Sequence, residues 1–126
     1  MPTLSTKTIK ILCSMASILL LFVGLFHGSG INYINGTVQT SNVSQLVKDV
    51  FPVLFISPSI QLIGLGIIGL FAVNKHTNYN ILLTLSILVL TNSILAFWLN
   101  AIIPGFILLI PSLIYLIAAW SSKNQE

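Results

Sequence analysis

The feature that most constrains this chain is a long stretch without charge. Between His76 and Lys123 lie 46 consecutive residues, 77–122, with no Asp, Glu, Lys or Arg. The hydrocarbon core of a bilayer is about 30 Å thick, and a helix that rises about 1.5 Å per residue crosses it in about 20 residues. An apolar run of this length is therefore expected to cross a membrane twice, as a helical hairpin.

The composition extends this expectation to the whole chain. Of the 126 residues, 56% are hydrophobic and only 6% are charged, whereas soluble domains carry about 25% charged residues. We therefore predict a single polytopic membrane domain over 1–126, with the lipid bilayer as its surroundings. A net charge of +3 spread over the loops is too sparse for nucleic acid, so no nucleic-acid partner is expected.

Hydropathy and helix-breaking residues divide the chain into four predicted spans, approximately 11–30, 51–73, 81–99 and 101–120. The turn between the last two lies either through Pro104 and Gly105 or at Asn100 alone, because proline is also tolerated in the first turn of a helix. The predicted fold class is an all-α membrane protein, a bundle of four transmembrane helices.

The segment between the first two spans carries a second pattern. Val43, Leu46, Val47 and Val50 recur at helical spacing, with polar residues between them. This spacing predicts a short amphipathic helix that lies in the membrane interface, either as a lid or docking surface or as a simple seal over the bundle.

The lysines predict the orientation. Lys7, Lys10, Lys75 and Lys123 flank the spans on one side, whereas Lys48 and Asp49 cancel on the other. The positive-inside rule therefore places both termini in the cytoplasm. All five basic residues are lysine, and isoleucine and asparagine are abundant. This composition is typical of an AT-rich genome, so we expect a prokaryotic cytoplasmic membrane.

Polar residues inside the predicted spans are the candidate ligand-binding groups. They could converge on a pocket open to the outer face, because intramembrane polar groups often mark function. The alternative is that they are ordinary interhelical hydrogen-bonding groups, worth about 0.6 kcal/mol each. The candidates are His27, Asn32, Gln61, Asn92 and Tyr115.

Glycines in the first two spans predict close approach of helix backbones. They would serve contact between spans one and two or, alternatively, a homodimer face. The predicted packing residues are Gly24, Gly28, Gly64, Gly66 and Gly69.

Other chemistry is disfavoured by where the reactive residues fall. His27 and His76 lie at different depths, which disfavours bis-histidine haem, and the acids Asp49 and Glu126 are expected on opposite sides of the membrane. Two separated histidines and the distant Cys13 cannot form a zinc site. We therefore expect no cofactor, no metal and no catalytic residue.

Three functions remain as hypotheses. The first is a non-catalytic membrane protein that is an accessory or scaffolding subunit of a larger complex, or a homo-oligomer. The second is a carrier or binding protein for a lipid, quinone or other small hydrophobic molecule. The third, least favoured, is a membrane-interface enzyme with His27 as base and Asp49 as its orienting group.

Overall fold

The computed structural model describes residues 4–75 and 78–123, and every regular element within these ranges is an α-helix. Within these ranges four helices are long and apolar enough to cross a membrane, as predicted, when α1 and α2 are counted together as one bent helix. This is consistent with an integral membrane protein. The helices are α1 Thr6–Ser29, α2 Ile31–Thr40, α3 Gln45–Lys75, α4 Tyr79–Trp98 and α5 Ile102–Lys123.

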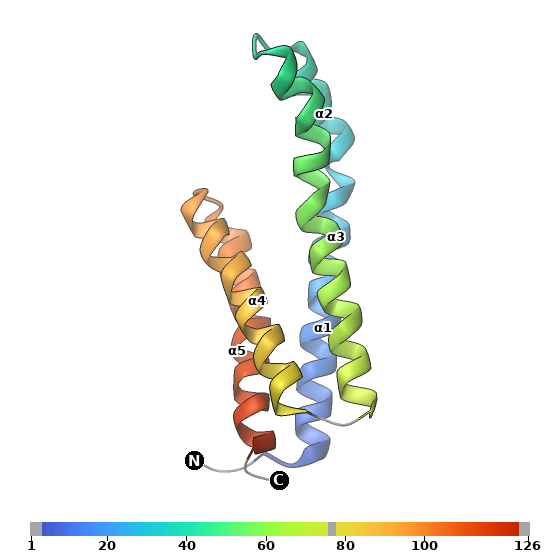
Figure 1. Ribbon diagram of the computed structural model, residues 1–126, viewed down its shortest axis with the longest axis vertical. Helices are drawn as coiled ribbons and strands as arrows, with labels where there is room; N and C mark the ends of the chain where they lie inside the picture. The colour runs from blue at the N-terminus through green and yellow to red at the C-terminus, as the bar shows by residue number, and fades with distance from the viewer. Residues whose placement is uncertain (1–3, 76–77, 124–126) are drawn as a thin grey trace.

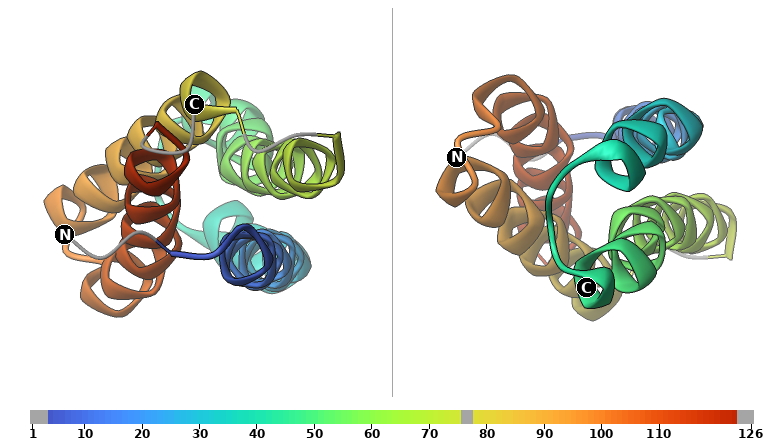
Figure 2. Two further views of the ribbon diagram at one scale, coloured as in Figure 1. Left: turned by 90° about the horizontal axis from the view of Figure 1, so that it is seen from below. Right: turned by 90° about the horizontal axis from the view of Figure 1, so that it is seen from above.

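The helices form two antiparallel hairpins. The first hairpin consists of α1, α2 and α3, and the second of α4 and α5; most helix contacts fall within these pairs. The hairpins join at one end of the molecule, where α1 packs against α5 and, to a smaller extent, α3 against α4. Figures 1 and 2 show the hairpins close together at that end and apart at the other.

Local signals explain where the helices begin and turn. The side chain of Ser5 caps α1 by accepting the N–H of Thr8, and that of Asn78 caps α4 by accepting the N–H of Asn80. The turn between α4 and α5 is centred on Asn100, which adopts a φ of 59°. Asn tolerates this left-handed backbone better than most residues. Because α5 begins at Ile102, Pro104 lies in its first turn.

The expected separate amphipathic helix over 43–50 is not found. Val43 precedes α3, whereas Leu46, Val47 and Val50 occupy its first turns without a break. Pro52 removes the backbone donor that would have bonded the carbonyl of Lys48. The side-chain amide of Gln39 donates to that carbonyl instead, at 3.1 Å, which joins α2 to α3.

Segment 31–40, which lies between the first two predicted spans, forms α2 and continues the direction of α1 after a bend at Gly30 (Figure 1). The N–H of Gly30 donates to the carbonyl of His27 at 3.3 Å, and its own carbonyl accepts the first bond of α2, from Ile34. The backbone hydrogen bonding therefore passes through the bend.

The two hairpins differ in length. At about 1.5 Å per residue, the 35 residues of α1 and α2 and the 31 of α3 span about 52 and 46 Å, whereas the 20 of α4 and 22 of α5 span about 30 and 33 Å. The second hairpin thus matches the thickness of a bilayer core. The first rises beyond the α4–α5 turn, as Figure 1 shows.

Candidate functional site

A buried polar contact lies where α1, α3 and α5 meet. The hydroxyl groups of Tyr115 and Ser17 share a hydrogen bond of 2.7 Å, and Ser17 also donates to the carbonyl of Cys13 at 2.8 Å. Tyr115, Ser17 and Cys13 are all fully buried. A Cβ atom on Gly69 of α3 would collide with the hydroxyls of both Tyr115 and Ser17. Tyr115 therefore joins three helices in the core and does not line an open pocket.

The glycines of α1 and α3 differ in their surroundings. A Cβ on Gly24 would lie 2.8 Å from Ile63, one on Gly28 3.3 Å from Ser59, and one on Gly66 2.8 Å from the carbonyl of Ser17. These glycines lie within the chain's own α1–α3 contact. Gly64 has open space where its Cβ would be.

His27 lies in the last turn of α1 and contacts α3. Its Nδ1 is hydrogen-bonded to Oγ of Ser59 at 2.9 Å, and its ring stacks on Phe55 with centroids 4.5 Å apart. Ser59 is buried, and Asp49 accepts a bond from Gln45 at 2.8 Å. The pairing of His27 with Asp49 that an enzyme at this face would need is not among the hydrogen bonds of the described residues.

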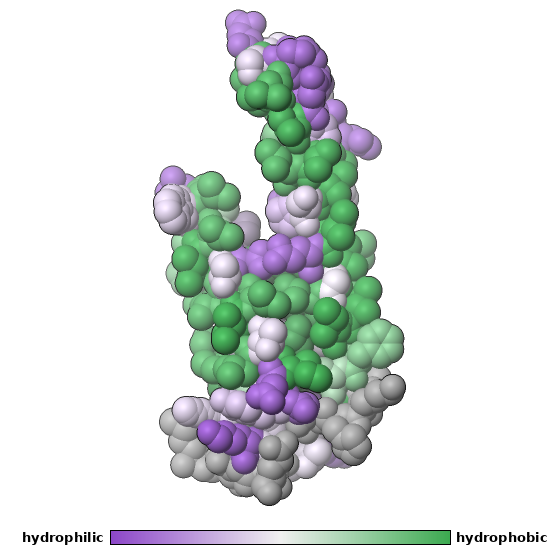
Figure 3. All heavy atoms as spheres, viewed as in Figure 1, coloured by the Kyte–Doolittle hydropathy of each residue, from purple (hydrophilic) through white to green (hydrophobic). Residues whose placement is uncertain are grey.

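Gln61 and Asn92 are the two candidate residues with amide side chains inside the spans. They lie at about the same distance from the end where the hairpins join, on opposite sides of the gap between the hairpins. Gln61 is 14 residues before the end of α3 and Asn92 13 residues after the start of α4, or about 21 and 20 Å along the helices. They are the only Asn, Gln or charged residues in 51–73 and 81–98. Figure 3 shows a hydrophilic band in the gap where the hairpins diverge, with apolar atoms above and below.

Helical spacing indicates that both amides face this gap. Leu65 and Leu88 line the groove between α3 and α4. Gln61 lies four residues from Leu65 on α3, and Asn92 lies four residues from Leu88 on α4, each towards the end where the hairpins diverge. Residues four apart share a helix face. The side-chain amide of Asn92 donates a hydrogen bond of 2.8 Å to the carbonyl of Leu88 in its own helix.

Gln61 is exposed. Within residues 4–75 and 78–123, no hydrogen bond is found for its side chain. Asn32 is the last of the candidate binding residues. It is exposed on α2 and is not part of the gap between α3 and α4.

A contact that sequence reasoning missed holds α4 to α5. Ser86 donates to the carbonyl of Ser112 at 2.9 Å, Ser112 returns a bond to the carbonyl of Ser86 at 3.1 Å, and Ser93 donates to the carbonyl of Gly105 at 2.7 Å. All four residues are buried. Ser86 and Ser93 are seven residues apart, as are Gly105 and Ser112, and this heptad spacing of small residues was the available signal.

Among the described residues, no three His, Cys, Asp or Glu side chains lie close enough together to hold a metal ion. His76 and Glu126, which entered the arguments on haem and paired carboxylates, lie outside the described residues.

No protein-family model matches the chain, and comparisons with curated proteins and with solved structures found no significant match.

Proposed function

We propose that this protein is a non-catalytic membrane subunit that associates, through the gap between its hairpins, with another membrane polypeptide or with a second copy of itself. The observation that carries the proposal is Gln61, an exposed amide about 21 Å along the helix from the end of α3. In hydrocarbon an amide without a partner is costly, and transmembrane helices use such groups to hydrogen-bond across interfaces.

The walls of the gap support this function. Leu54 lies seven residues before Gln61 on the same face of α3, and Leu95 lies three residues after Asn92 on the same face of α4. Both are exposed. A helix inserted between the hairpins would cover these apolar side chains and bring a polar group to Gln61.

The association can be tested by native mass spectrometry after gentle extraction from the protein's own membrane. We expect a defined multimer or additional polypeptides. A Gln61→Leu variant should weaken the complex roughly three- to twentyfold, because interhelical hydrogen bonds contribute about 0.6–1.7 kcal/mol.

The matched control is Thr91→Val, which removes an exposed hydroxyl already bonded to its own helix at the carbonyl of Ile87. This variant should associate like the unaltered chain. A monomer without polypeptide partners would contradict the proposal, as would equal losses in both variants.

The carrier function is the second candidate. The groove between α3 and α4, about 240 Å³, is the observation that favours it. The groove opens sideways, and its volume is smaller than the roughly 300–1,000 Å³ of typical ligand pockets. We therefore rank the carrier function second to association.

For the orientation, we propose a cytoplasmic location for both termini. Lys7, Lys10 and Lys123 are exposed at one end of the bundle, which supports this proposal through the positive-inside rule. A membrane-impermeant maleimide should label Thr40→Cys in intact cells and Lys7→Cys only after permeabilisation. Native Cys13 gives little background because it is fully buried. The reverse labelling pattern would overturn the orientation.

A further inference from the structure

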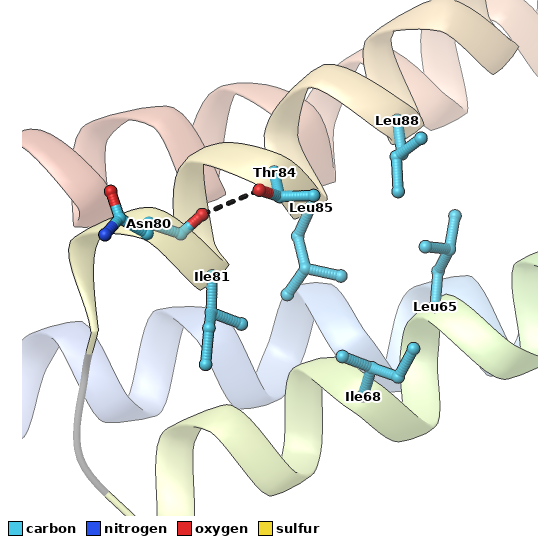
Figure 4. A pocket seen from close by; sticks show the side chains of 7 residues that line it. All are labelled: Leu65, Ile68, Asn80, Ile81, Thr84, Leu85 and Leu88. Carbon is cyan, nitrogen blue, oxygen red and sulfur yellow. Dashed lines mark hydrogen bonds between the residues drawn. The ribbon is translucent and has the colours of Figure 1, made fainter.

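A shallow apolar groove runs between α3 and α4 on the side of the lysine-rich end, below the gap described above. Figure 4 shows Ile81, Leu85 and Leu88 of α4 and Leu65 and Ile68 of α3 pointing into the space between the two helices. Asn80 and Thr84 complete the lining. The groove is thus aliphatic along its length, with its polar atoms on the side of Asn80 and Thr84.

The dimensions of the groove fit an extended hydrocarbon chain. From Asn80 to Leu88, the first and last lining residues on α4, the helix rises about 12 Å. One leaflet occupies about half of the roughly 30 Å bilayer core, so the groove runs through most of the depth of a single leaflet. Ile68, Ile81 and Leu88 remain substantially exposed, so the groove opens sideways to the membrane and an acyl chain can enter from the bilayer.

Positive charge lies near the mouth of the groove. Nζ of Lys123 is 5.5 Å from the centroid of the Tyr79 ring, and Tyr79 is the neighbour of Asn80. Lys7 and Lys10 lie at this same end, in the first turns of α1. Asp49, the one acid among the described residues, lies at the opposite end. The charge at this end therefore complements a phosphate-bearing anionic headgroup.

We propose that the protein binds one anionic phospholipid from the leaflet at its lysine-rich end. One acyl chain lies in the α3–α4 groove, and the headgroup lies by Asn80 and Lys123. This site rests on the carrier function, the second candidate above, and names its ligand. It does not depend on the association proposed first, because neither Gln61 nor Asn92 lines the groove.

The experiment is native mass spectrometry of the full chain in micelles that contain equimolar dioleoyl-phosphatidylglycerol and dioleoyl-phosphatidylcholine. We expect one retained phosphatidylglycerol per chain, favoured over phosphatidylcholine at least about fivefold, since one lysine near an anionic surface contributes about that factor. Lys123→Gln should lower this preference by about fivefold, whereas Lys48→Gln, at the far end, should leave it unchanged.

A second pair of variants tests the groove. Leu88→Trp fills it and should reduce retention of both lipids severalfold, whereas Ile87→Trp, on an exposed position outside the lining, should not. Equal retention of the two lipids by the unaltered chain would overturn the site. Equal behaviour of the two tryptophan variants would also overturn it, as would release by Leu88→Trp of a bound polypeptide in place of a lipid.

Discussion

Replacing Gly66 with alanine is expected to destabilise the protein, whereas the same replacement at Gly64, two residues earlier, is expected to stabilise it. In both cases alanine gains up to about 1 kcal/mol of helix propensity over glycine. At Gly66 the new methyl would lie 2.8 Å from the backbone carbonyl of Ser17, which cannot rotate away. Overpacking of this kind costs about 1–3 kcal/mol, so the net effect is a loss of up to about 2 kcal/mol.

Gly64 serves as the matched control because its methyl would meet no atom within 4 Å. The measurement is the free energy of unfolding in mixed detergent micelles, by titration with a denaturing detergent. Leucine at the two positions should widen the difference. If Gly66→Ala were as stable as Gly64→Ala, the α1–α3 contact described here would be wrong.

Ser112→Leu is expected to have the largest effect within the second hairpin, a loss of about 3 kcal/mol in the free energy of unfolding. The leucine would overfill a fully buried position against α4, at about 1–3 kcal/mol. It would also remove the bond that Ser112 donates to the carbonyl of Ser86, worth about 0.6 kcal/mol. Ser112→Ala removes only the hydrogen bond and should lose about 0.6 kcal/mol.

The difference between the two Ser112 variants separates packing from hydrogen bonding in the same unfolding titration. Thr84→Val is the control within α4, because the exposed Thr84 hydroxyl bonds the carbonyl of Asn80 in its own helix, and its change should stay within about 0.5 kcal/mol. A Ser112→Leu protein as stable as its alanine counterpart would show that α4 and α5 do not pack through this position.

The sequence was sufficient for the number of membrane-length helices, since that depends on apolar length alone. It was not sufficient for the pairing of helices, because lipid-facing and protein-facing apolar residues have the same character. The glycines of α3 show this at single positions. Gly66 and Gly69 are three residues apart and share a face, whereas Gly64 is about 200° around the helix from Gly66; treating all three as packing residues overlooked this difference.

The start of α3 was misjudged for another physical reason. The amphipathic spacing of 43–50 favoured a separate helix before the second span, and Pro52 follows that segment. The helix continues because proline's fixed φ is compatible with a helix, and because Gln39, thirteen residues earlier, supplies the bond that the carbonyl of Lys48 would otherwise lack. A compensation of this kind comes from a neighbouring helix and has no local signature.

Among the candidate binding residues, the sequence did not indicate what surrounds His27 and Tyr115. His27 and Tyr115 each form a hydrogen bond to a serine on another helix, Ser59 and Ser17. Serine is common enough in transmembrane helices that neither partner could be singled out without knowing which helices touch.

The unequal hairpins have a consequence for the lipid around the protein. From Phe51 to Val73 the uncharged part of α3 extends about 33 Å, whereas from Ile81 to Trp98 that of α4 extends about 26 Å. A bilayer core of about 30 Å cannot match both heights, and each ångström of mismatch costs a fraction of a kcal/mol. The protein therefore presents two hydrophobic thicknesses to one membrane. Lipids beside the first hairpin must stretch, or that hairpin must tilt, while those beside the second keep their ordinary thickness.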